Sequence, residues 1–72
     1  MKIIIDDEVK DLKSIGLETE GIQLDQLSQK LSEHPSKLAI LVNDKFIPKE
    51  KWQETFLKEN DRVETISLIA GG

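Results

Sequence analysis

The last residues of the sequence, Ala70, Gly71 and Gly72, have the types and spacing that best suit a chemical role. Glycine has no side chain, so two consecutive glycines form bare backbone that can enter a cleft too narrow for larger residues. At about 3.3 Å per extended residue, the stretch from Ile69 to Gly72 reaches roughly 13 Å beyond a preceding strand. This ending predicts a projecting tail that can thread into a narrow site.

The tip of such a tail carries a carboxylate, which is ionised at neutral pH. A carboxylate can attack the α-phosphate of ATP to form an acyl-adenylate, and a sulfur nucleophile can then displace AMP to leave a thiocarboxylate. The alternative is that Gly71 and Gly72 only end the chain as an unstructured terminus. The elements before the tail must decide between these two interpretations.

The rest of the sequence has few groups suited to catalysis. It contains no cysteine, which excludes disulfides and thiolate metal sites and favours a reducing, cytoplasmic location. The single histidine, His34, falls in the last turn of a predicted helix, where the helix dipole favours a capping role over catalysis. No phosphate loop, metal-ligand cluster or nucleophile with its base is recognisable. We therefore expect no catalytic residues, no metal and no bound cofactor.

The composition suits a small compact domain. The chain has 72 residues, 38% hydrophobic and 33% charged, with a net charge of −4. Negative charge argues against nucleic-acid binding and suits either docking onto a basic partner or solubility alone. The longest apolar run, residues 38–42, is too short to span a membrane, and we expect no signal peptide before the strand predicted at residues 3–5. We expect a monomer that binds neither nucleic acid nor membrane.

The N-terminal half predicts a hairpin followed by one helix. Residues 3–5 are β-branched and form a strand, and residues 9–15 alternate loosely as a second strand after a polar turn. Three leucines then recur at helical spacing, and the helix ends near His34 because Pro35 cannot continue it. These leucines are Leu24, Leu27 and Leu31.

The C-terminal half predicts three strands, at residues 38–43, 46–47 and 62–69. Pro48 opens a short helical turn that continues to Trp52, which we expect to anchor this turn on the core rather than to stack on a ligand. The fold class is therefore α+β, a mixed sheet of four to five strands with one main helix packed on one face. Core candidates are Met1, Ile3, Ile5, Leu27, Leu31 and Ile40.

The same half carries a pattern that resembles a known family. It reads Val42-Asn43-x-x-Phe46-Ile47-Pro48-Lys49-x-x-Trp52, then the turn Asn60-Asp61, then Leu68-Ile69-Ala70-Gly71-Gly72. With these motifs, residues 38–72 resemble the thiamine-biosynthesis sulfur carriers of the ThiS/MoaD family, which have the ubiquitin-like β-grasp fold. The Pro-basic-x-x-Trp element is similar to the thiamine branch rather than the molybdopterin branch.

The N-terminal half is less similar to that family. Gln23-Leu24 and Leu27-Ser28 stand where the family usually has Thr-Val and Leu-Leu pairs, and the first hairpin lacks an Asn-Gly turn. The leucine stripe keeps the fold, which the resemblance implies to be a single β-grasp domain over residues 1–72 with a flexible tail at residues 70–72. Sulfur delivery in another pathway, for molybdopterin or an amino acid, stays open.

The resemblance also implies a mechanism with partners. An adenylating enzyme related to ubiquitin-activating enzymes would use ATP to activate Gly72, with Gly71 and Ala70 giving the tail access to its site. A persulfide donor, such as a cysteine desulfurase system, would then replace AMP by sulfur from cysteine. Thiazole synthase would take the sulfur from the thiocarboxylate. The carrier itself would be a protein substrate and not an enzyme.

The last strand gives two conflicting predictions for its exposed face. Alternation places Ile66, Leu68 and Ala70 on one face and Val63, Thr65, Ser67 and Ile69 on the other. Polarity alone would bury Ile66 and Leu68, whereas the family resemblance implies that they are exposed for docking. We favour docking, because exposed apolar patches on small domains usually mark interfaces. The expected partner-binding residues are Ile66, Leu68 and Ile69.

Two other functions fit the same fold. A ubiquitin-like modifier would join Gly72 to lysines through isopeptide bonds and form conjugates that survive denaturation and reducing agent. A plain β-grasp interaction module would end in Gly-Gly incidentally, and an extension after Gly72 would then be harmless.

Overall fold

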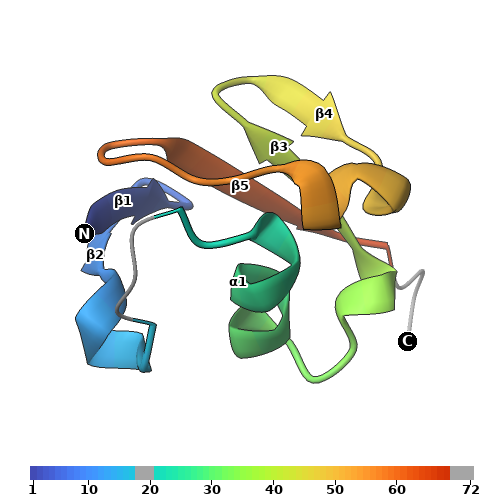
Figure 1. Ribbon diagram of the computed structural model, residues 1–72. Helices are drawn as coiled ribbons and strands as arrows, with labels where there is room; N and C mark the ends of the chain where they lie inside the picture. Colours follow the sequence, from blue (N-terminus) through green and yellow to red (C-terminus); the bar gives the residue numbers. More distant parts are fainter. Residues whose placement is uncertain (18–20, 69–72) are drawn as a thin grey trace.

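In a computed structural model that describes residues 1–17 and 21–68, the chain forms one five-stranded sheet and one main helix. The strand order is β2-β1-β5-β3-β4 (Figure 1). The central strand β5 lies between two antiparallel hairpins, and it is parallel to β1 of one hairpin and antiparallel to β3 of the other. The predicted mixed sheet with one helix is confirmed. The elements are β1 (Lys2–Ile5), β2 (Glu8–Asp11), α1 (Leu24–Leu31), β3 (Leu38–Val42), β4 (Lys45–Ile47) and β5 (Arg62–Ser67).

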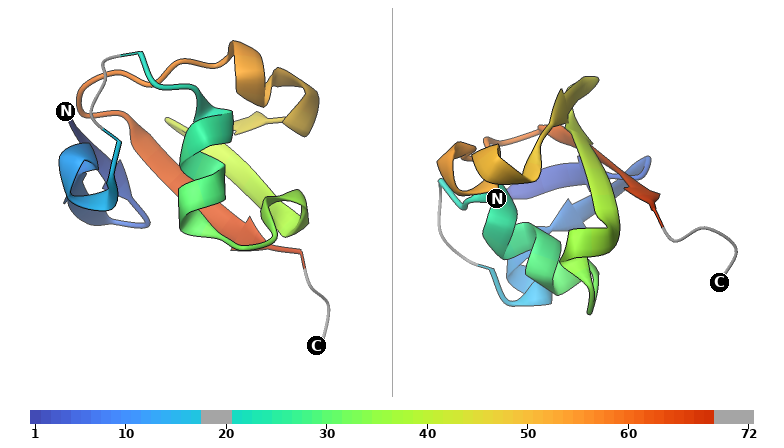
Figure 2. Two further views of the ribbon diagram at one scale, coloured as in Figure 1. Left: turned by 60° about the horizontal axis from the view of Figure 1, so that its bottom comes forward. Right: turned by 90° about the vertical axis from the view of Figure 1, so that its right-hand side faces the viewer.

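The core lies between α1 and one face of the sheet, which we call the inner face (Figure 2). Side chains alternate between the faces of a strand, so β-branched residues at every second position of β1 can all point inward. Ile3 and Ile5 do so, and Ile40 and Val63 join them from β3 and β5. No helix in the described residues is long and apolar enough to cross a membrane.

The helix α1 forms where the leucines recur at helical spacing. Leu24 and Leu27 are buried, and the main-chain N–H of Gln23 donates to Gln26 Oε1 at 3.1 Å, which ties down the first turn. The helix ends at Leu31, three residues before His34. The prediction of a capping role for His34 in the last turn is therefore wrong.

The early end of α1 has a local cause. Ser32 is extended, with φ −150° and ψ 146°, and its hydroxyl accepts a hydrogen bond from the His34 N–H at 3.0 Å. This side-chain bond offers the backbone an alternative to another helical turn. The chain then enters a 3₁₀ turn, η2 (Pro35–Lys37), which leads into β3.

The second strand is shorter than predicted. β2 stops at Asp11, and the following residues form a 3₁₀ turn, η1 (Leu12–Ile15), instead of continuing the strand. Asp11 Oδ1 accepts from the Lys13 N–H at 3.1 Å, and Gly16, with φ 85°, ends the turn. The turn brings Leu12 fully into the core, which loose alternation over residues 9–15 did not predict.

The short helical turn after β4 closes one end of the core, as expected. It is the 3₁₀ segment η3 (Lys49–Glu54), and it begins directly after Pro48. Trp52 is buried, and its indole Nε1–H donates to the carbonyl oxygen of Ile47 at 3.0 Å. The prediction that Trp52 is a packing anchor is confirmed. Leu57, which follows this segment, is also buried.

Leu27→Ala tests the packing of α1 on the sheet. Leu27 is fully buried, and removing a buried leucine side chain typically lowers the free energy of unfolding by about 2–5 kcal/mol. Urea unfolding followed by Trp52 fluorescence measures the loss. The matched control is Lys30→Ala, an exposed position on the same helix, which we expect to change stability by less than about 0.5 kcal/mol. Equal effects of the two substitutions would contradict this arrangement of the core.

Candidate functional site

The candidate site is the end of β5, where the chain leaves the sheet towards its last residues. β5 is the central strand, and beyond it the Leu68 N–H donates to the carbonyl oxygen of Lys37 at 2.8 Å. This bond continues the pairing with β3 by one residue. The predicted tail residues Ile69, Ala70, Gly71 and Gly72 lie outside the described residues. Their attachment point, Leu68, is held by the backbone of the sheet.

The structure selects one of the two predicted orientations of β5. Ile66 and Leu68 are 53% and 57% exposed, whereas Val63 is fully buried. Val63 lies opposite Ile5 on one side and Val42 on the other, and so belongs to the inner face. Because side chains alternate, Ile66 must face away from α1. The expected exposure of Ile66 and Leu68 is confirmed, while their role in partner binding stays a prediction.

The prediction from side-chain polarity, which would bury Ile66 and Leu68, is wrong for β5 because of the contacts that Thr65 makes. Its position on the inner side of β5 looked unfavourable for a polar residue, yet its N–H donates to Asp6 Oδ1 at 2.8 Å and its hydroxyl donates to Asp6 Oδ2 at 2.7 Å. Both polar groups of Thr65 therefore have hydrogen-bond partners on the inner side of β5, where the residue is half-buried. Asp6 is a site residue that the sequence reasoning missed, since nothing in the sequence pairs residues that are 59 positions apart.

Ile66 is part of a larger apolar surface on the face of the sheet opposite α1. Ala39 pairs with Ile66, and Leu41 pairs with Phe46, so the surface runs across β5, β3 and β4. Phe46 is 57% exposed, and Ala39 and Leu41 are half-buried. We call these four residues the outer patch. Apart from Ile66, the patch could not be predicted, because residues 38–42 are uniformly apolar and have no polar face.

Charged groups border the outer patch where β5 begins. The Arg62 guanidinium lies 2.7 Å from Asp44 Oδ1 and 4.0 Å from Glu64 Oε1. All three side chains are about half exposed or more, so these ion pairs add little to stability. They give one side of the patch a polar border, whereas the side towards Leu68 continues as apolar surface.

The turn between β3 and β4 is also tied to β5. Asn43, in the left-handed conformation with φ 51°, accepts the Arg62 N–H on its Oδ1 at 2.9 Å and donates from Nδ2 to Asp61 Oδ1 at 3.0 Å. Asp61 Oδ2 in turn accepts the Lys58 N–H at 2.7 Å. Side chains from both hairpin turns, Asn43 and Asp6, therefore hold β5 in place.

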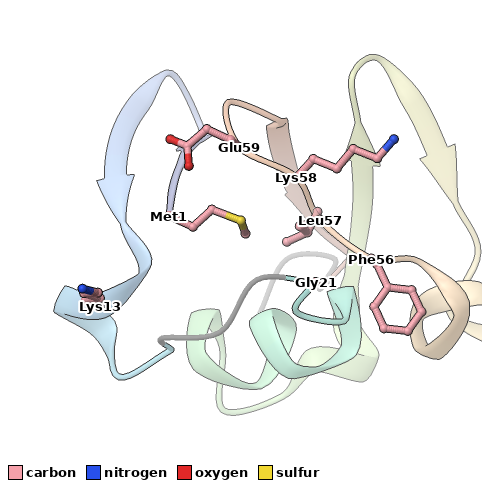
Figure 3. Close-up of a pocket in the computed structure, with 7 residues that line it drawn as sticks. All are labelled: Met1, Lys13, Gly21, Phe56, Leu57, Lys58 and Glu59. Atoms are coloured by element: carbon pink, nitrogen blue, oxygen red, sulfur yellow. The ribbon is translucent and has the colours of Figure 1, made fainter.

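The other end of the molecule has a cavity of about 600 Å³ but no arrangement of reactive groups (Figure 3). It lies near the start of β5, where the Asn60 N–H donates to the carbonyl oxygen of Lys2. The strand separates it from Leu68 by roughly 20 Å. No group of three or more His, Asp or Glu side chains in residues 1–17 and 21–68 could hold a metal ion. The cavity is lined by Met1, Lys13, Gly21, Phe56, Leu57, Lys58 and Glu59.

Comparison with known proteins supports the β-grasp prediction. The model of the ThiS family matches residues 5–72. The chain is 25% identical over 52 residues to the sulfur carrier protein ThiS of Escherichia coli (strain K12), which covers 72% of this chain and 79% of that protein. The crystal structure of the thiamine biosynthesis protein ThiS from Geobacter metallireducens is similar with a TM-score of 0.83 and 18% identity, over 100% of both chains. This last likeness shows that the fold is shared.

Proposed function

The chain belongs to the ThiS family, and from this premise we propose that it carries sulfur as a thiocarboxylate on Gly72. Members of this family are small sulfur carriers that work with partner enzymes and are not themselves catalysts. The observation that carries the proposal is the family match, which extends from residue 5 through β5 to residue 72. Gly72 would supply the reacting carboxylate, and Gly71 and Ala70 would give it access to enzyme sites.

The geometry at the end of β5 supports this use of the tail. Leu68 is bound to the sheet through its main-chain N–H and is exposed through its side chain, next to exposed Ile66. A partner that binds these two side chains meets the beginning of the tail within one residue. We assign partner binding to Ile66, Leu68 and Ile69, with the outer patch extending the contact.

The proposed reaction has three stages. A carboxylate oxygen of Gly72 attacks the α-phosphate of ATP in an adenylating enzyme, so that pyrophosphate leaves and an acyl-adenylate forms. The terminal sulfur of a persulfide donor, such as a cysteine desulfurase system, then attacks the acyl carbon and displaces AMP. A thiol cleaves the remaining S–S bond and leaves the thiocarboxylate, while the donor sulfur ends in a disulfide.

The acceptor we propose is thiazole synthase, in the formation of the thiazole ring of thiamine. The support is the name of the similar protein from Geobacter metallireducens, a thiamine biosynthesis protein, together with the Pro48-Lys49-x-x-Trp52 element. Delivery to molybdopterin or to an amino acid would use the same three stages to form the thiocarboxylate. The acceptor therefore needs its own assay, in which the loaded carrier is mixed with thiazole synthase and loss of sulfur is followed.

Intact mass spectrometry tests the carrier function. The protein with its native C-terminus is incubated with ATP, the host's adenylating enzyme and a sulfur donor. We expect a mass gain equal to the exchange of one oxygen for one sulfur, localised to Gly72 by fragmentation. If there is no gain while the same enzyme loads another carrier, the proposal is wrong. Conjugates on lysine side chains would instead indicate a ubiquitin-like modifier.

Gly71→Leu tests the narrow path of the tail. A branched side chain next to Gly72 would clash in a site shaped for bare backbone, so we expect no thiocarboxylate to form. Gly71→Ala, with one added methyl group, should give an intermediate rate. Circular dichroism of both variants should match that of the unaltered protein. Loading of Gly71→Leu at the normal rate would contradict a narrow, glycine-dependent path.

Ile66→Arg tests the docking surface. Ile66 is exposed, so we expect the free energy of unfolding to change by less than about 0.5 kcal/mol. Binding to the adenylating enzyme, measured by calorimetry, should weaken by roughly tenfold or more if Ile66 lies at the centre of the interface. The matched control is Val9→Arg, at an exposed apolar residue of the edge strand β2. Equal loss of binding in both variants would contradict a docking surface centred on β5.

A further inference from the structure

The tail end of β5 extends past the strand that pairs with it on one side. β1 pairs with β5 only through Ile4 with Arg62 and Ile5 with Val63, and the chain then turns away at Asp6. The last backbone bond on that side runs from the Asp6 N–H to the carbonyl oxygen of Val63 at 2.9 Å. On the other side, β3 stays paired with β5 as far as Ser67.

Beyond the last backbone bond between the two segments, the side chain of Asp6 provides the hydrogen bonds to β5. Its two carboxylate oxygens accept the two hydrogen-bond donors of Thr65, the main-chain N–H at 2.8 Å and the hydroxyl at 2.7 Å. Hydrogen bonds to an ionised carboxylate are shorter and stronger than neutral ones. Two bonds in different directions fix both the position of the Thr65 backbone and the rotation of its side chain.

This bracing has a direct effect on the neighbouring residues. A rotation of the backbone at Thr65 would turn Ile66 out of its position on the outer patch, because adjacent side chains of a strand point to opposite faces. The same rotation would redirect the chain at Leu68, which leads into the tail. The Asp6 carboxylate therefore supports, from the β1 side, two features that β3 holds from the other side and that partner enzymes are proposed to use.

The backbone of Asp6 adopts an unfavourable left-handed conformation in this position. Asp6 and Asp7 both adopt positive φ, 49° and 68°, in a two-residue turn for which glycine or asparagine is more favourable. Asp7 makes no side-chain hydrogen bond or ion pair in the part of the chain that the structure describes, whereas Asp6 makes two. The two aspartates thus share a conformation and a charge but differ in their contact with β5.

We propose that Asp6 is a positioning residue of the sulfur carrier, whose carboxylate holds Thr65 and thereby helps to fix the outward face of Ile66 and the course of the chain up to Leu68. This inference rests on the proposed function. Asp6 does not touch the reacting carboxylate, and it acts through Thr65 alone.

The matched pair Asp6→Gly and Asp7→Gly tests the proposal. Glycine relieves the left-handed conformation equally at both positions, and only Asp6→Gly removes the bonds to Thr65. Steady-state adenylation is measured with the host's adenylating enzyme, well below the unfolding temperature of every variant. Asp6→Gly should raise the KM for the carrier about three- to tenfold, as expected from losing two hydrogen bonds, with kcat within about twofold. Asp7→Gly should behave like the unaltered protein.

Amide hydrogen exchange provides a second readout on the same variants. In Asp6→Gly the Thr65 N–H loses its acceptor, so its exchange should accelerate by at least about tenfold relative to Asp7→Gly. The Val63 N–H, on the same side of β5 but within the pairing with β1, serves as the internal reference. Unchanged exchange at Thr65 would overturn the bracing.

Asp6→Asn separates bracing from charge. The asparagine amide oxygen can accept the Thr65 N–H, and its NH₂ group can donate to the Thr65 hydroxyl, so the KM should return close to normal. If the KM of Asp6→Asn is as high as that of Asp6→Gly, the partner enzyme interacts directly with the negative charge of Asp6. This result would overturn the positioning role. A lower melting temperature of Asp6→Gly with an unchanged KM would reduce Asp6 to a structural residue and would also overturn it.

The outcomes distinguish this inference from the proposed function. If the unaltered protein and Asp7→Gly are both inert towards an adenylating enzyme that is active on another carrier, the proposed function fails and the inference fails with it. If the unaltered protein is adenylated and Asp6→Gly has the same KM, only the inference fails.

Discussion

The structure depends on the insertion of β5 between β1 and β3. The last strand within the described residues is the central strand of the sheet, with parallel pairing to β1 on one side and antiparallel pairing to β3 on the other. Without it, two hairpins would lie side by side with no hydrogen bonds between them. Val63 is the residue of β5 that is most closely surrounded by the neighbouring strands. It lies opposite Ile5 of β1 and Val42 of β3, and it is fully buried on the inner face.

One strand therefore serves two purposes through its two faces. Its inner residues complete the hydrophobic core, and its outer residue Ile66 joins Ala39, Leu41 and Phe46 in the outer patch. The side chains that brace β5 come from the turns of both hairpins, Asn43 at its start and Asp6 near its end. These polar side-chain contacts add to the backbone pairing of β5, while its inner side chains belong to the packed core.

The elements that depend on local signals could be predicted from the sequence. The leucine spacing of α1, the proline before η3 and the β-branched residues of β1 each act within a few residues. The family resemblance of residues 38–72 correctly indicated the β-grasp fold and the exposed face of β5. Contacts between distant residues could not be predicted: the Asp6–Thr65 pair reversed the polarity argument at β5. At Asp11 and Ser32, side-chain bonds to the backbone ended β2 and α1 earlier than periodicity suggested.

The outer patch also links recognition to folding. Its residues come from three strands and lie together only when β5 has entered the sheet, whereas a Gly-Gly tail has the same chemistry in an unfolded chain. An enzyme that requires both the patch and the tail would load sulfur only onto folded carriers and would leave unfolded or damaged copies unmodified. By mass action, its binding would also stabilise the folded state. The placement of one strand would thus act as a check on the folding of the carrier before the proposed thiocarboxylate is made.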